Sequence, residues 1–139
     1  MSFHWTDYLN LAISLQLDPE SPDLSGLSEA ALRSAASRAY YATFHCALDL
    51  ARREGFRPTS SGEDHRAVQD HFRHFVPPDS LHSEVARELA LLHIRRKDAD
   101  YEGHFEGRPK NQATLAINLA RSILENLDCI RTARPDVEA

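Results

Sequence analysis

The segment that decides the fold is EAALRSAASRAYYATFHCALDLARRE, residues Glu29 to Glu54. Its apolar residues recur every three or four positions, which is the period of an α-helix. They occupy two faces of that helix, so both faces are expected to be buried against other helices. The first face carries Leu32, Ala35, Ala36, Ala39, Thr43, Cys46, Ala47 and Leu50, and the second carries Tyr41, Phe44 and Leu48. Gly55 follows directly and predicts the end of the helix.

Four more helices are expected from the same periodicity. Breaker-rich stretches at 18–26, 56–62, 77–78 and 103–109 separate them, and no run of alternating β-branched residues indicates a strand. The helices cover about Trp5–Gln16, Asp64–Phe75, Ser80–Tyr101 and Asn111–Thr132. The sequence therefore predicts an all-α fold, an up-and-down four-helix bundle with an additional short N-terminal helix. We interpret residues 1–139 as one domain, in which 1–26 form the N-terminal helix and loop and 133–139 a flexible tail.

Composition narrows the class of protein. The chain is 42% hydrophobic and 27% charged, the balance of a globular domain. No stretch has the apolar length of a membrane span, and the N-terminus lacks the layout of a signal peptide, so a cytoplasmic protein is expected. The net charge of -5 argues against broad, nonspecific binding of nucleic acid, but it allows a local basic pocket. Cys46 and Cys129 fall in apolar helical patterns and are expected to be buried thiols.

Two segments carry a resemblance to a known family. SRAYYATFHCALDL, Ser37 to Leu50, resembles the SRAYYAxFHAAxxLL helix of one branch of the HEPN superfamily. ELALLHIRRKDADYEG, Glu88 to Gly103, resembles the LxxLRxxADYD segment of that branch, with matches at Arg96, Ala99, Asp100 and Tyr101. His65 stands where the branch often has a Thr-His-Ser start to the intervening helix. All three agree in order and spacing, and the resemblance covers roughly Leu27 to Leu127.

The resemblance implies a helical bundle that dimerises and, in many members, cleaves RNA without a metal or other cofactor. The family signature is an Arg followed after four to six residues by a His, and two such motifs meet across the dimer interface. Arg96 takes the Arg position, where it would neutralise the growing charge of the scissile phosphate. The position of the proton-transferring His holds Tyr101, a weak base at neutral pH because its usual pKa is near ~10. The nearest downstream His is His104.

The residues themselves leave two interpretations open at this helix end. Arg95 and Lys97 flank Arg96, and the triplet either contacts phosphate or forms a solvated face near a helix C-terminus, where cations are favoured. Arg96 and Asp100 also have the spacing of a local salt bridge, which needs no function.

A second pair, Arg38 and His45, lies nearly two helical turns apart and therefore shares one helix face. That face is either part of the phosphate-binding pocket, where Arg38 would bind phosphate, or a polar edge of the central helix. Whether His45, His65 or His104 reaches the site is left open by the sequence. No spacing of His, Cys, Asp and Glu indicates a metal site.

Three functions are compatible with these patterns. The first is an RNA-interacting HEPN protein of a toxin–antitoxin or defence system, a metal-independent endoribonuclease whose dimer cleft gathers Arg96, Asp100, Tyr101 and His104. The second is a noncatalytic module that binds a partner nucleotidyltransferase or a nucleotide, with Tyr101 as acceptor of a nucleotidyl group. The third is a structural dimerisation domain that packs through the alanines of the central helix. The expected partners are a second copy of the chain, RNA and a nucleotidyltransferase, with no membrane and no cofactor.

Overall fold

The all-α prediction is confirmed in a computed structural model that describes residues 4–17, 28–59, 63–101 and 109–133. The described residues form five helices and no strand. The helices are α1 (Thr6–Leu17), α2 (Ser28–Arg53), α3 (Asp64–Arg73), α4 (Ser80–Tyr101) and α5 (Pro109–Ala133). The predicted loop at 18–26, the tail from 134 onward and His104 lie outside the described residues.

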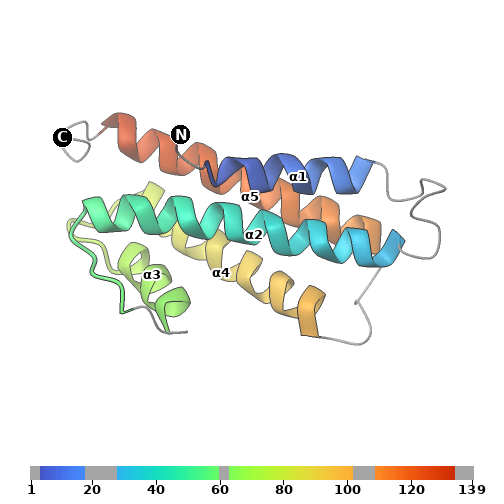
Figure 1. Cartoon of the computed structure of the whole chain (residues 1–139). Helices are drawn as coiled ribbons and strands as arrows, with labels where there is room; N and C mark the ends of the chain where they lie inside the picture. Colours follow the sequence, from blue (N-terminus) through green and yellow to red (C-terminus); the bar gives the residue numbers. More distant parts are fainter. Residues whose placement is uncertain (1–3, 18–27, 60–62, 102–108, 134–139) are drawn as a thin grey trace.

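Helix α2 is the central element of the fold and contacts each of the other four helices. In Figure 1 it runs between α1 and α5 on one side and α3 and α4 on the other. Helix α4 also packs against α5 and α3, and α1 packs against α5. This arrangement confirms the expectation that α2 is buried on two sides.

Small side chains on α2 make this close packing possible. Ala35, Ala36, Ala39, Ala42 and Ala47 are all fully buried, so neighbouring helices approach the α2 backbone closely. Larger side chains from the other helices fill the space between the helices. Burial of each such aliphatic or aromatic side chain stabilises the folded protein by ~2 kcal/mol. These groups include Val68, Phe72, Val85, Leu89, Leu92, Ile123 and Leu127.

Three details differ from the sequence prediction. Helix α5 begins at Pro109, two residues before the predicted start, and it includes Ala133, which the sequence prediction assigned to the tail. Helix α3 ends at Arg73, two residues early, and Phe75 lies beyond its end, where its ring stacks on His82 with centroids 3.7 Å apart. The prediction that both cysteines are buried is wrong for Cys129, which is exposed, whereas Cys46 is partly buried. Position 129 lies on the outer side of α5, because the inward direction is taken by Leu127 and Ile130. Within the described residues, no helix is both long enough and apolar enough to cross a membrane.

Candidate functional site

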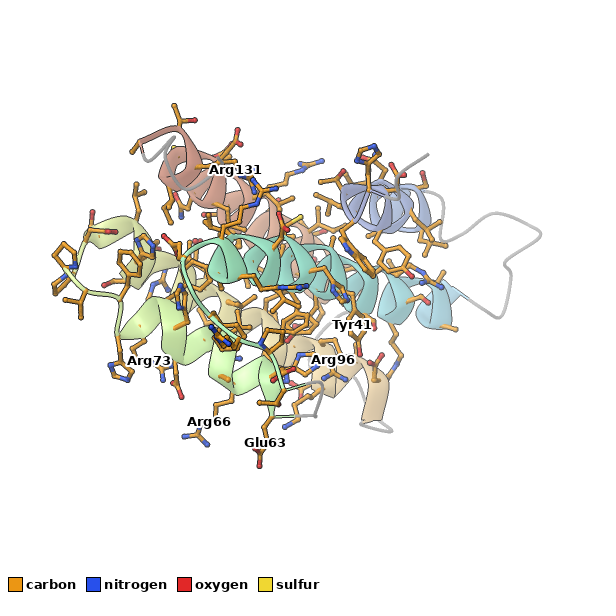
Figure 2. The ribbon with its side chains drawn as sticks, turned by 60° about the vertical axis from the view of Figure 1, so that its left-hand side comes forward. Tyr41, Glu63, Arg66, Arg73, Arg96 and Arg131 are labelled. Carbon is orange, nitrogen blue, oxygen red and sulfur yellow. The ribbon has the colours of Figure 1, made fainter. Side chains whose placement is uncertain are left out.

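Arg96 points from α4 into the protein, toward α2 and next to Tyr41, as Figure 2 shows. Only 7% of the residue is exposed. Its guanidinium carbon lies 5.4 Å from the ring centre of Tyr40 and 5.6 Å from that of Tyr41, which is cation–π distance for both. By contrast, Glu63, Arg66 and Arg73 stand out from the exposed side of α3 in the same view.

Asp100 joins the end of α4 to α2. Its Oδ2 atom lies 3.4 Å from Nη1 of Arg96 and accepts a hydrogen bond from the Ser37 hydroxyl at 3.2 Å. Arg33, also on α2, donates from Nη1 to the carbonyl oxygen of Ala99 at 3.0 Å. Carbonyl groups in the last turn of a helix lack partners within that helix, so this bond fixes the end of α4 against α2. The salt-bridge interpretation of Arg96 and Asp100 is therefore correct, within a larger contact that spans two helices.

Two partly buried imidazoles, those of His65 and His93, extend the cluster around Tyr40. The Tyr40 hydroxyl is hydrogen-bonded to Nδ1 of His65, whose ring stacks on Phe44 with centroids 4.2 Å apart. The rings of His65 and His93 are 5.3 Å apart, and the Gln69 side-chain amide donates to Nδ1 of His93 at 3.0 Å. His65, left open by the sequence, thus reaches the residues around Arg96.

Burial and the Arg96 charge keep these imidazoles neutral. Burial lowers the pKa of His65, and Arg96 lowers it further, with only Asp64 acting in the opposite direction. Burial, followed by the charges of His65 and Arg96, lowers the pKa of His93 from 6.5 to about 4. Burial also raises the pKa of Tyr40 far above its usual value, an effect that Arg96 offsets only in part. The interior of the cluster therefore holds one buried cation, a protonated phenol and two uncharged imidazoles at neutral pH.

A cavity of about 380 Å³ opens next to this cluster, between α1, α2 and the end of α4. Its α2 wall is one helical stripe, because its members are three or four positions apart. The lining residues are Trp5, Tyr8, Ser34, Ser37, Arg38, Tyr41, His45 and Asp100. Tyr41 and Asp100 line the cavity and also contact Arg96, so Arg96 lies directly behind its wall. Arg38 and His45 both line this cavity, which agrees with their position on one face of α2.

The cavity offers both a hydrogen-bond donor and a neutral base. The guanidinium carbon of Arg38 lies 5.9 Å from the ring centre of Tyr8, and its buried Nε atom has no hydrogen-bond partner among the described residues. A buried donor without an acceptor costs free energy. The His45 ring stacks on Trp5 with centroids 3.5 Å apart. Burial, followed by His65, lowers the pKa of His45, so its imidazole is uncharged at neutral pH.

The structure divides the basic triplet predicted at the end of α4. Arg95 donates to the Gln112 side chain on α5, away from Arg96, and Lys97 is exposed. Successive helix positions differ by about 100°, so three neighbouring side chains cannot share a face. Tyr101 is the last residue of α4, but its side chain lies outside the description, as does His104.

Several residues of the site were not singled out by the sequence as site residues. Trp5 and Tyr8 reach the cavity only because α1 packs along α2, and no local pattern gives that contact. Ser37 stands inside the family-like SRAYY segment, so its position was a usable signal. Among the residues of known placement, no group of three His, Cys, Asp or Glu side chains is arranged to hold a metal ion.

Comparisons of this chain with protein-family models, curated proteins and solved structures gave no match. The function is therefore argued from the cavity and the cluster behind it.

Proposed function

We propose that the chain is a HEPN-like protein of a toxin–antitoxin or defence system that binds an RNA phosphodiester in the α1–α2–α4 cavity and cleaves it without a metal. The observation that carries this proposal is the convergence of Arg38, Ser37 and His45 on one cavity wall, with Arg96 behind it. The proposal includes a cytoplasmic homodimer and the four-helix arrangement with an additional N-terminal helix. A dimer cleft at Arg96, as the family resemblance implies, stays a prediction.

The chemistry needs a cation for the phosphate and an acceptor for one proton. The Arg38 guanidinium would hold a nonbridging phosphate oxygen and stabilise the charge that grows as the 2′-hydroxyl attacks phosphorus. The neutral His45 imidazole would accept the proton of that hydroxyl. The bond to the 5′ oxygen then breaks, and the leaving oxygen takes a proton from water. The products are a 2′,3′-cyclic phosphate and a 5′-hydroxyl.

Arg96 has a supporting role in this scheme. It forms an ion pair with Asp100, whose carboxylate lines the cavity. The positive charge of Arg96 partly offsets that carboxylate, so Asp100 would repel a bound phosphate less strongly. Because Arg96 also contacts Tyr41, it positions a second lining residue. The proposed direct contact to RNA therefore moves from Arg96 to Arg38.

Incubation of the purified protein with total RNA in EDTA tests the proposal. We expect fragments that end in cyclic phosphate, and we expect Arg38→Ala and His45→Ala to reduce their amount strongly while the helical circular dichroism signal persists. Arg121→Ala serves as the matched control, because Arg121 is exposed on α5. If no RNA fragment forms and no RNA is bound, the proposal is wrong.

The aromatic wall of the cavity favours the second candidate, a noncatalytic module that binds a nucleotide or a partner nucleotidyltransferase. Trp5, Tyr8 and Tyr41 line the cavity together with Arg38, whose guanidinium carbon lies 5.9 Å from the Tyr8 ring centre. A base can stack on an aromatic ring while its phosphate meets the cation. Trp5 is the single tryptophan of the chain and therefore reports on the cavity directly. Saturable quenching by adenosine monophosphate, lost in Arg38→Ala, together with an absence of RNA cleavage would favour this function. Intact mass after coexpression with a nucleotidyltransferase would test modification of Tyr101.

A further inference from the structure

Helix α4 has a second apolar face, opposite the one that it buries in the protein. Its inner face carries the fully buried Val85, Leu89 and Leu92. On the outer face, Leu91 is 40% exposed and Ile94 is 57% exposed, although both are large hydrophobic residues. A helix that is apolar on two faces is expected to be covered on both.

The outer face has the spacing of a helix-pairing seam. Arg87, Leu91, Ile94 and Asp98 follow one another at intervals of four, three and four residues, the pattern by which two helices pack along a line. The middle two positions are apolar, and the end positions carry opposite charges. Arg87 pairs with Glu84 within its own helix, but both partners are exposed, and an exposed pair of this kind contributes little to stability.

A shallow groove adjoins the seam on the side of α3. It has a volume of about 450 Å³ and lies between Arg73 and the outer face of α4. Ala86 and Ala90 line it, and their small side chains leave room for a large apolar group from another helix. The groove and the seam together form a continuous docking surface.

We infer that this surface binds the same surface of a second copy of the chain, with the two α4 helices antiparallel. In that arrangement Arg87 faces Asp98 of the second copy, and Leu91 faces Ile94 of the second copy. Both contacts occur twice because the pairing is symmetric. A parallel pairing would instead place Arg87 against Arg87 and Asp98 against Asp98, and like charges across an interface are unfavourable. The charge order along the seam therefore makes this surface complementary to itself and favours the antiparallel direction.

This arrangement gives the proposed homodimer an interface other than the Arg96 cleft that the family resemblance implies, and it does not depend on RNA binding. Arg96 lies on the buried side of α4, facing away from the seam. The two cavities would therefore lie on the far sides of the dimer, one complete site in each copy. The family-like arrangement, with two Arg96 motifs in a shared cleft, requires a different interface.

Light scattering during size-exclusion chromatography tests the seam through charge reversal. The unmodified chain is expected to elute as a dimer of 15.7 kDa subunits at high micromolar concentration. Arg87→Asp and Asp98→Arg should each weaken dimerisation roughly tenfold or more, because each places like charges in contact. The double variant Arg87→Asp/Asp98→Arg should recover the dimer, while Arg121→Asp on α5 should leave it unchanged.

Disulfide trapping tests the direction of the helices. In a Cys129→Ser background, the double substitution Arg87→Cys/Asp98→Cys should give a covalent dimer on oxidation. A bond within one chain is excluded, since eleven positions of an α-helix span ~16 Å and a disulfide joins Cα atoms less than ~7 Å apart. Cys129→Ser alone should give no covalent dimer. A monomeric unmodified chain, charge reversals without effect, or failure of the double variant to recover the dimer would each overturn the inference.

Discussion

The Arg96 guanidinium carbon lies 5.4 Å from the ring centre of Tyr40, between α4 and α2. Tyr40 is itself fully buried and hydrogen-bonded to His65 of α3. This one contact therefore connects three helices through a cation, a phenol and an imidazole. A residue in such a position is part of the protein core as well as of the site.

Arg96→Ala is consequently expected to lower stability as well as any activity. The substitution removes two cation–π contacts and the ion pair with Asp100, and it leaves a space beside Tyr40. We expect the free energy of unfolding in urea to fall by about 2 kcal/mol. Arg96→Met, which keeps most of the side-chain volume, should cost about 1 kcal/mol. Equal stability of the alanine variant and the unmodified chain would contradict the buried placement of Arg96.

Arg38→Ala should separate binding from stability. Arg38 is partly exposed at the cavity, and its ring contact with Tyr8 is long at 5.9 Å. The loss in free energy of unfolding should stay within about 0.5 kcal/mol. Affinity for a short RNA, measured by fluorescence anisotropy, should nevertheless fall by roughly tenfold or more, because a charge-assisted contact to phosphate is lost. If Arg38→Ala unfolds the protein but binds RNA normally, the cavity is not the binding site.

The pH dependence of cleavage should identify His45 as the proton acceptor. Its pKa lies below 6.5, owing to burial and then to His65. A base acts in its deprotonated form, so the rate should rise with pH up to that pKa and level off above it. His45→Gln should remove this rise, whereas His74→Gln should preserve it, because His74 is exposed beyond the end of α3. An unchanged profile in His45→Gln would exclude this role.

The sequence could predict which helices form but only part of how their polar groups meet. The sequence indicates which side of α4 faces the core, because Val85, Leu89 and Leu92 form an apolar stripe that continues to Arg96 and Ala99. That stripe already separates Arg96 from Arg95 and Lys97.

The neighbours of Arg96 and of the cavity were less predictable. Tyr40 and Tyr41 stand beside each other in sequence, yet both contact the same guanidinium across a helix–helix interface. Trp5 and Asp100 line one cavity although they lie far apart in the sequence. Such contacts depend on the docking of α1 and α4 onto α2, which local periodicity does not encode.

A partly buried charge network at the other end of α2 predicts a second pH effect. Nε2 of His82 lies 2.9 Å from the Glu54 carboxylate, and Nδ1 lies 2.8 Å from that of Asp79. Both ring nitrogens face ionised carboxylates, which only accept hydrogen bonds, so the bonded ring is an imidazolium. His71 of α3 also bonds to Glu54, at 2.9 Å. The network therefore ties α3 and the start of α4 to the end of α2.

The pKa shifts of this network give a defined pH window. Burial alone would lower the pKa of His82, but its bonds to Glu54 and Asp79 outweigh that effect and raise the pKa above 6.5. Its contribution to stability is therefore complete below pH 6.5 and is lost as the pH rises through the folded-state value. Burial alone would raise the pKa of Glu54, but the bonds from His71 and His82 lower it from 4.5 to about 2. That contribution is complete above pH 4.5 and is lost as the pH falls toward 2.

His82→Gln should consequently destabilise the protein most between pH 4.5 and 6.5. We expect a loss of about 3 kcal/mol there, because the substitution leaves the buried Glu54 without its cationic partner. The measurement is the difference in free energy of unfolding between the variant and the unmodified protein across pH. The lowered pKa values of His65 and His93 reduce stability in acid, but they do so equally in both proteins, so this effect cancels in the difference. The difference should shrink above the raised pKa of His82. A difference that stays constant from pH 5 to pH 9 would mean that His82 is neutral and that the network holds no imidazolium.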